Sequence, residues 1–172
     1  MKHIRELFYE LDKSSHKWDP YFDVYDKHLS RFRGKSPKIL EIGVQNGGSI
    51  DMWQQYFGEG TKIVGIDVLP ECTNLKYNGD VEIVIGDQAS EQFWNEFLDK
   101  HGTFDIVIDD GGHTMIQQLV TINKVFPFVN EGGVFICEDT HTSYWPDWGG
   151  QFNKPNTFLD YAKQLTDYLN RE

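Results

Sequence analysis

A length of 172 residues is that of a single domain, and the apolar and aromatic content is that of a globular protein with a substantial core. The formal net charge of −11 argues against a surface that follows nucleic-acid phosphates, because such surfaces depend on Lys and Arg. This charge balance favours an enzyme acting on small molecules or a cation-binding protein. Only two widely separated cysteines are present, and there is no apolar segment that could span a bilayer or form the core of a signal peptide. We therefore expect a cytoplasmic protein that binds neither nucleic acid nor membranes.

The N-terminal residues 1–36 predict a helical cap. Apolar residues with helical spacing predict a first helix, at Ile4, Leu7, Phe8 and Leu11. A polar loop is expected over 12–17 and an aromatic helix around 21–29. Residues 37–172 predict the core of the same single domain, because strand-like and helix-like patterns alternate there without a linker or an internal repeat. The whole chain, 1–172, is therefore expected to form one α/β domain.

Five apolar segments predict parallel strands, over 38–44, 62–67, 81–85, 104–109 and 134–137. The segments between them carry apolar residues at helical spacing and predict helices around the sheet. Their expected buried faces are Ile50, Trp53 and Phe57; Phe93, Trp94, Phe97 and Leu98; and Ile116, Leu119, Ile122, Asn123 and Phe126. A final helix is expected from about 157 to 169.

A glycine-rich turn follows the first strand, where the glycines permit a tight bend and a close approach of backbone to a ligand. Ser49 can cap the helix after it, and an ordinary strand-to-helix connection is the alternative interpretation of the whole turn. Asp67 ends the second strand about 20 residues later, the position that holds ribose hydroxyls in nucleoside-binding α/β folds. Asp87 and Gln88 end the third strand and are candidates for an adenine amino group. Capping of the next helix is the alternative for Asp87.

Four carboxylates and one imidazole follow the fourth and fifth strands: Asp109, Asp110, His113, Glu138 and Asp139. Because ligands bind beyond the carboxyl ends of parallel strands, we expect these side chains to gather at one edge of the sheet. Clustered carboxylate oxygens are the ligands that Mg²⁺ prefers. The alternatives are helix capping by the two aspartates of the fourth strand, a solvated loop after the fifth, and a solvent-facing histidine.

An aromatic cluster lies beyond the fifth strand and is followed by two glycines. Tyr144, Trp145 and Trp148 are expected to form a lid against the flat face of a sugar. An interface or a core patch is the alternative interpretation of these aromatic residues.

These motifs, in this order, resemble class I S-adenosylmethionine-dependent methyltransferases, and the glycine turn differs from the Gly-x-Gly-x-x-Gly pattern of dinucleotide-binding folds. More specifically, the chain resembles the metal-dependent sugar O-methyltransferases of macrolide biosynthesis, of the mycinamicin and tylosin type. The resemblance covers roughly residues 11–150. It rests on Asp12-Lys-Ser-Ser-His16 with Tyr21 and Tyr25, Leu40-Glu-Ile-Gly-Val44, Ile108-Asp-Asp-Gly-Gly-His113, and Glu138-Asp139 with Thr142-Ser-Tyr-Trp145.

The resemblance implies a Rossmann-like parallel sheet in the order 3-2-1-4-5, with helices on both faces, and S-adenosylmethionine and Mg²⁺ as cofactors. The implied cofactor-binding residues are Glu41, Gly43, Gly47, Ser49, Asp67, Asp87, Gln88 and Asp109. The implied magnesium ligands are Asp110, Glu138 and Asp139, and the segment around His16 is implied to fold over the cofactor, with a plain surface loop as the alternative.

The predicted activity is methylation of a hydroxyl on a sugar or a glycosylated small molecule, with His113 as the general base. A hydroxyl is a poor nucleophile near neutral pH, and imidazole titrates in the range that a base needs. One alternative is a protein that binds S-adenosylmethionine or another nucleoside without turnover. A second is a hydroxylase-like relative on the same fold, which would need an iron site with two histidines and one carboxylate.

The sequence departs from the resembled family after its final predicted helix. The class I sheet has seven strands, whereas no strand-like segment follows that helix here. Either the chain is truncated, or it is a naturally minimal form whose sheet edge is covered by a partner subunit or by the N-terminal segment. Because an uncovered edge strand invites pairing with another chain, a homo-oligomer is among the expected states.

Overall fold

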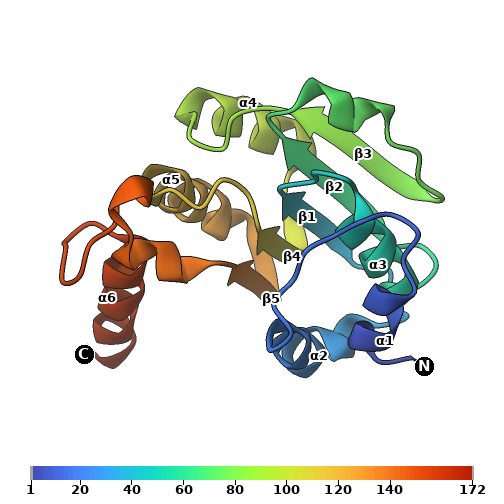
Figure 1. Ribbon diagram of the computed structural model, residues 1–172, viewed down its shortest axis with the longest axis horizontal. Coiled ribbons are helices and arrows are strands. Elements are labelled where there is room, and N and C mark those ends of the chain that lie inside the picture. The colour runs from blue at the N-terminus through green and yellow to red at the C-terminus, as the bar shows by residue number, and fades with distance from the viewer. Residues whose placement is uncertain (1, 172) are drawn as a thin grey trace.

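The computed structural model describes residues 2–171, and within them one five-stranded parallel sheet has the order β3-β2-β1-β4-β5 (Figure 1). The strands are β1 (Lys38–Ile42), β2 (Lys62–Asp67), β3 (Asp80–Ile85), β4 (Phe104–Asp109) and β5 (Val129–Cys137). The predicted α/β, Rossmann-like fold with the order 3-2-1-4-5 is therefore confirmed.

Helices cover both faces of this sheet. They are α1 (Ile4–Tyr9), α2 (Tyr21–Leu29), α3 (Gly48–Phe57), α4 (Glu91–His101), α5 (Met115–Val125) and α6 (Phe158–Asn170). Figure 1 shows α1, α2 and α3 on one side and α4 and α5 on the other, with α6 extending away from the sheet. None of the helices within residues 2–171 is long and apolar enough to cross a membrane.

The two layers of helices explain why the central strands carry apolar residues on both faces. Ile39 of β1 packs with α1, α2 and α3, whereas its neighbour Leu40 packs with α4 and α5. Because successive side chains of a strand point to opposite faces, a strand covered on both sides needs apolar residues on both of its faces. The N-terminal helices contribute Phe22 and Tyr25 to the first layer, where they pack with Trp53 of α3.

Three strand boundaries differ from the prediction, and that of β3, which begins at Asp80, differs by one residue only. β1 ends at Ile42, two residues early, because Gly43 has a φ of +94° and turns the chain. β5 begins at Val129, five residues early, and includes Gly132 and Gly133, which look like a turn in the sequence. The pairing of β4 with β5 shifts register in this part of the sheet, so the two glycines lie in an irregular part of the strand rather than in a connection.

The buried face of α5 also differs from the prediction, while the expected faces of α3 and α4 are confirmed. Ile116 and Phe126 were expected to be buried but are 63% and 57% exposed. Gln118 and Thr121 are buried instead, because each has a buried polar partner. Gln118 donates to the carbonyl of Glu138 (3.1 Å), and Thr121 accepts a bond from Gln88 (3.1 Å).

The carboxyl ends of β2, β1, β4 and β5, which are neighbours in this order in the sheet, are level with one another. Ile42 pairs with Ile66 and with Asp109, and Asp109 pairs with Cys137. The loops that follow these strands therefore leave the sheet at one edge and pack closely. A Cβ atom on Gly43 would lie 2.0 Å from the carbonyl oxygen of Asp110, so only glycine fits where the loop after β1 passes the loop after β4.

Replacing Gly43 by alanine should destabilise the fold more than the same change at Gly58. Both residues have positive φ, so both variants carry backbone strain of about 1–2 kcal/mol, but nothing lies within 4 Å of a Cβ at Gly58. We expect Gly43→Ala to lose about 2 kcal/mol more than Gly58→Ala in urea unfolding, because its methyl group meets backbone that cannot move aside. Equal losses of unfolding free energy in the two variants would show that the loops after β1 and β4 can move apart without cost.

Candidate active site

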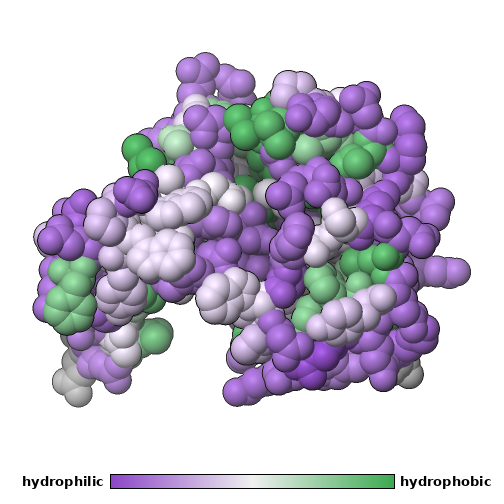
Figure 2. Space-filling view, in the orientation of Figure 1, coloured by the Kyte–Doolittle hydropathy of each residue, from purple (hydrophilic) through white to green (hydrophobic). Residues whose placement is uncertain are grey.

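A cavity of about 640 Å³ lies at the edge where the strands end. It is lined by the loops after β1, β2, β3 and β4, by Asp139 after β5, and by Ser14, Ser15 and His16 of the N-terminal segment. Figure 2 shows mainly hydrophilic side chains in the hollow between the N-terminal helices and the region after β5. Eight of the predicted site residues line the cavity: Gly43, Ser49, Asp67, Asp87, Gln88, Asp110, His113 and Asp139.

Asp67 ties the glycine turn to the end of β2. Its Oδ2 accepts backbone N–H bonds from Val44 (2.9 Å) and Gln45 (2.8 Å), and its Oδ1 accepts one from Leu69 (2.9 Å). The carboxylate thus shapes the loop that lines the cavity, and its contact with ribose hydroxyls stays a prediction. The expected cap by Ser49 is wrong, because the N-cap of α3 is Gly47, with a φ of +81°.

Glu41, Gly47 and Asp109 do not line the cavity, and their predicted cofactor contacts stay a prediction. Glu41 and Asp109 belong to β1 and β4 themselves, so their side chains lie buried in the core rather than in the loops. Glu41 accepts a bond from Trp53 Nε1 (3.2 Å), and Asp109 accepts one from Gln88 Nε2 (3.0 Å). Burial raises the pKa of each carboxyl to about 7.

Gln88, in the loop after β3, holds the loop after β4 in place. The side-chain oxygen of Gln88 accepts the backbone N–H of Gly112 (2.7 Å) while its nitrogen donates to Asp109. Asp87 accepts the N–H of Ala89 (2.8 Å), and it does not cap α4, since Ser90 occupies that N-cap. The capping alternative for Asp87 is therefore wrong, and adenine recognition by this pair stays a prediction.

Asp110, His113 and Asp139 form one compact group of potential metal ligands. Each offers a ligand atom, and these atoms all lie within 4.8 Å of one another. His113 Nε2 is 3.7 Å from Asp110 Oδ1 and 3.5 Å from Asp139 Oδ2. Burial lowers the pKa of His113, and the two carboxylates only partly oppose this, so the neutral imidazole predominates near neutral pH. The capping and solvent-facing alternatives are wrong, because Thr114 is the N-cap of α5 and the imidazole is only 17% exposed.

The backbone is strained at two members of this group. His113 and Asp139 have φ values of +56° and +51°, a conformation that costs a residue other than glycine about 1–3 kcal/mol. The hydroxyl of Thr142 lies 2.8 Å from the carbonyl oxygen of His113 and 3.0 Å from that of Asp139. The buried side chain of Thr142 therefore holds both strained residues in place, with the imidazole of His113 facing the carboxylate of Asp139.

Glu138 is buried beside this group but is not a member of it. Its carboxylate accepts bonds from Lys17 Nζ (2.8 Å) and from the hydroxyl of Tyr25 (2.5 Å). Burial raises the pKa of Glu138, and the adjacent ammonium of Lys17 opposes that rise. The solvated-loop alternative is wrong because Glu138 is buried, and its role as a magnesium ligand beside Asp110 and Asp139 stays a prediction.

Residues of the N-terminal segment complete the site, and the sequence did not indicate their roles. Lys17 also contacts Asp110 Oδ2 (2.5 Å), and Tyr21 donates to Asp139 Oδ1 (2.8 Å). Burial raises the pKa of Tyr21 to about 12, so its hydroxyl stays protonated as a donor. The four-residue spacing of Tyr21 and Tyr25 placed both on one face of a helix, which was a usable signal. No local signal distinguishes Lys17 from an ordinary loop lysine.

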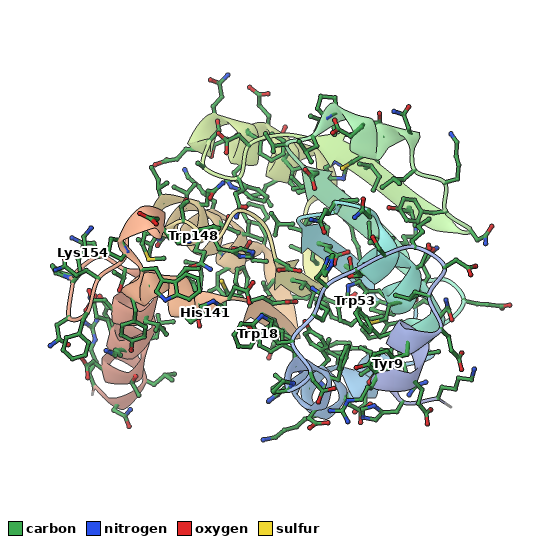
Figure 3. The ribbon with its side chains drawn as sticks, viewed as in Figure 1. Tyr9, Trp18, Trp53, His141, Trp148 and Lys154 are labelled. Carbon is green, nitrogen blue, oxygen red and sulfur yellow. The ribbon has the colours of Figure 1, made fainter. Side chains whose placement is uncertain are left out.

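Aromatic rings surround the mouth of the site. The ring of Trp148 is centred 6.1 Å from that of His113, and Trp145 packs edge-on against His141 (4.6 Å). Trp18, from the N-terminal segment, lies 5.1 Å from His141, and Figure 3 shows Trp18, His141 and Trp148 in the same part of the molecule. Tyr144 turns away and pairs with Phe152. The lid function of Tyr144, Trp145 and Trp148 stays a prediction.

The ligand group suits a hard divalent cation. Asp110 and Asp139 supply carboxylate oxygens, the donors that Mg²⁺ prefers, and they converge at one point of the cavity. An iron centre of the hydroxylase type needs two histidines and one carboxylate, whereas this group has one histidine and two carboxylates. The chemistry of the donors therefore does not favour the hydroxylase alternative.

Comparison with known proteins gives the relatives of this chain, although no family model matches it. It is 32% identical over 169 residues to 8-demethyl-8-alpha-L-rhamnosyl tetracenomycin-C 2'-O-methyltransferase of Streptomyces olivaceus, which covers 92% of the chain and 44% of the relative. It is 33% identical over 158 residues to mycinamicin VI 2''-O-methyltransferase of Micromonospora griseorubida, covering 86% and 39%.

A solved structure gives the same result. The MycE methyltransferase of the mycinamycin biosynthetic pathway, in complex with Mg, SAH and mycinamycin VI, superposes with a TM-score of 0.87 at 30% identity. The match covers 99% of this chain and 49% of that one. This chain is a homologue of these sugar O-methyltransferases and has the class I methyltransferase fold. It spans about half the length of MycE and less than half that of the two relatives above.

Replacing Glu41 by glutamine should weaken the pH dependence of stability. The folded-state pKa of Glu41, about 7, lies above the ordinary value of 4.5, so the folded protein holds this proton more tightly than the unfolded chain does. Its contribution to stability is present below pH 4.5 and is lost as the pH rises to 7. We expect urea unfolding of Glu41→Gln to show a smaller loss between pH 5 and pH 7.5, by on the order of 3 kcal/mol at most. Parallel pH profiles for both proteins would contradict a raised pKa of the buried Glu41 carboxyl.

Proposed function

We propose that this chain is an S-adenosylmethionine-dependent O-methyltransferase that uses Mg²⁺ to methylate a hydroxyl of a sugar or glycosylated small molecule. The observation that carries the proposal is the position of His113 and two carboxylates in the same cavity as the glycine turn. A methyl donor bound on the turn and an acceptor bound at the cation would meet in that cavity. The sugar O-methyltransferases that share this fold support the assignment of reaction and acceptor class.

The cofactor is assigned from the shape of the cavity. Its walls are the glycine turn, the Asp67 loop and the Asp87–Gln88 loop, which follow three adjacent strands as in nucleoside-binding α/β folds. A volume of about 640 Å³ is within the range of small-molecule sites. S-adenosylmethionine bound there would supply the methyl group and a neutral thioether as leaving group.

His113 is assigned as the general base. The imidazole would accept the proton of the acceptor hydroxyl while the hydroxyl oxygen displaces the thioether from the methyl carbon of bound S-adenosylmethionine. The lowered pKa of His113 keeps the imidazole ready to accept that proton near neutral pH. Asp110 and Asp139 would hold Mg²⁺, which orients the acceptor and stabilises the negative charge developing on its oxygen.

The acceptor, the domain arrangement and the compartment are assigned on separate grounds. Trp145 and Trp148 beside the site offer flat apolar faces of the kind that sugars pack against. The N-terminal segment is assigned as a cap on the same single domain, since α1 and α2 share a core with α3 and the sheet. Cys72 and Cys137 are both free, which suits the reducing cytoplasm.

Calorimetric titration with S-adenosylmethionine tests the cofactor assignment, with NAD as the control and Mg²⁺ in the buffer. We expect micromolar binding of S-adenosylmethionine alone, about −8 kcal/mol, because the cavity lacks the dinucleotide glycine pattern. Absence of binding by both nucleosides would favour a protein that has lost the cofactor site.

Substituting His113 by alanine tests the base. In an assay with glycosides of 6-deoxysugars bearing free vicinal hydroxyls, we expect His113→Ala to lose methyl transfer by about 10²–10⁴-fold. Its affinity for S-adenosylmethionine should stay within a few-fold of the wild type. His28→Ala is the matched control, because His28 is exposed on α2, outside the cavity. Unchanged transfer by His113→Ala would remove this histidine from the mechanism.

A further inference from the structure

The ammonium of Lys17 lies between two carboxylates of the site. Its Nζ is 2.5 Å from Asp110 Oδ2 and 2.8 Å from Glu138 Oε1, and the side chain is completely buried. Tyr25 donates to the same oxygen of Glu138, which leaves that carboxylate well satisfied. Charged groups are rarely buried this fully unless they are paired, so the arrangement is a built ion pair rather than a chance surface contact.

Asp110 belongs to two groups at once. Through Oδ2 it pairs with Lys17, and through Oδ1 it faces His113, in the group of potential metal ligands. A divalent cation on Asp110 would therefore lie close to a buried ammonium, and like charges repel strongly where water is excluded. The ammonium of Lys17 and a divalent cation would therefore compete for the carboxylate oxygens of Asp110.

We propose that Lys17 is a positioning residue that neutralises Asp110 and Glu138 before metal binds, and that a divalent cation displaces its ammonium when it binds. The proposal rests on the cation site of the proposed function and adds to it an internal competitor supplied by the chain. Displacement would free the carboxylate of Glu138 to bind the metal. This would explain why Glu138, a predicted metal ligand, contacts a lysine in the structure.

The same lysine holds one end of a wall of the cofactor cavity. Ser14, Ser15 and His16 line the cavity, and Lys13 on their other side pairs with Asp51 (3.1 Å). The wall is tightly packed, since a Cβ on Gly48 would lie 2.6 Å from the carbonyl oxygen of Ser14. Release of Lys17 would loosen one end of this wall only, so metal binding and cofactor binding would influence each other reciprocally.

Lysine acetylation of the wild-type protein tests the displacement directly. The protein is treated briefly with an amine-reactive acetylating reagent with and without Mg²⁺, and modification of each lysine is measured by mass spectrometry. We expect Lys17 to be protected without metal and its modification to rise about tenfold with Mg²⁺, while Lys13 is modified equally in both. Lys17 modification that does not respond to Mg²⁺ would overturn the proposal.

A variant gives the complementary measurement. Mn²⁺ binding is followed by the electron paramagnetic resonance signal of the free ion, in wild type, Lys17→Met, Lys17→Arg and the matched control Lys13→Met. We expect Lys17→Met to bind Mn²⁺ about tenfold more tightly, and Lys17→Arg and Lys13→Met to resemble the wild type. Equal or weaker Mn²⁺ binding by folded Lys17→Met would contradict the competition.

Two further results separate this proposal from the proposed function. Circular dichroism establishes whether Lys17→Met is folded, and if it is not, the acetylation of wild type decides alone. S-adenosylmethionine is titrated into the same wild-type sample. Cofactor binding with an unresponsive Lys17 would overturn only the role of Lys17, whereas loss of cofactor binding with a responsive Lys17 would overturn only the methyltransferase assignment.

Discussion

The convergence of acidic side chains at one edge of the sheet is the constraint on which the rest of the site depends. Five carboxyl groups lie at or just beyond the carboxyl ends of β1, β4 and β5: Glu41, Asp109, Asp110, Glu138 and Asp139. Such a group is unfavourable unless each charge is neutralised, paired or hydrogen-bonded. The protein meets the requirement by different means: the raised pKa values of Glu41 and Asp109, the ammonium of Lys17, and the hydroxyls of two tyrosines.

These means divide the acids into two layers. Glu41 and Asp109 lie inside the core, where Glu41 accepts a bond from Trp53 of α3 and Asp109 holds Gln88, which supports the loop after β4. Asp110 and Asp139 lie above them in the loops and face the cavity with His113. The lower layer fixes the backbone from which the upper layer projects. This arrangement gives the preorganisation that a catalytic site needs, because charges held by a rigid frame need not reorient during the reaction.

The strained residues fit the same interpretation. His113 and Asp139 adopt positive φ values that only the surrounding contacts can maintain, and Thr142 joins their two carbonyl groups. Strain of this kind tends to occur where function requires a side chain in a particular place. The relatives with the same fold carry out sugar O-methylation, so a site of this design is consistent with the chemistry of its homologues.

The sequence alone predicted the five parallel strands, the loops that meet at the sheet edge, and the gathering of Asp110, His113 and Asp139, because these follow from local patterns and from parallel topology. The strand order came from the resemblance to class I methyltransferases, and the structure confirms it. The tertiary structure alone decided which polar groups are buried. Lys17 lies 93 residues from Asp110 and 121 from Glu138 in sequence, so no periodicity could pair them. The exposed apolar residues of α5 and the core positions of Glu41 and Asp109 have the same cause. A side chain's burial depends on the partners that distant segments bring to it, and a local pattern contains no record of those partners.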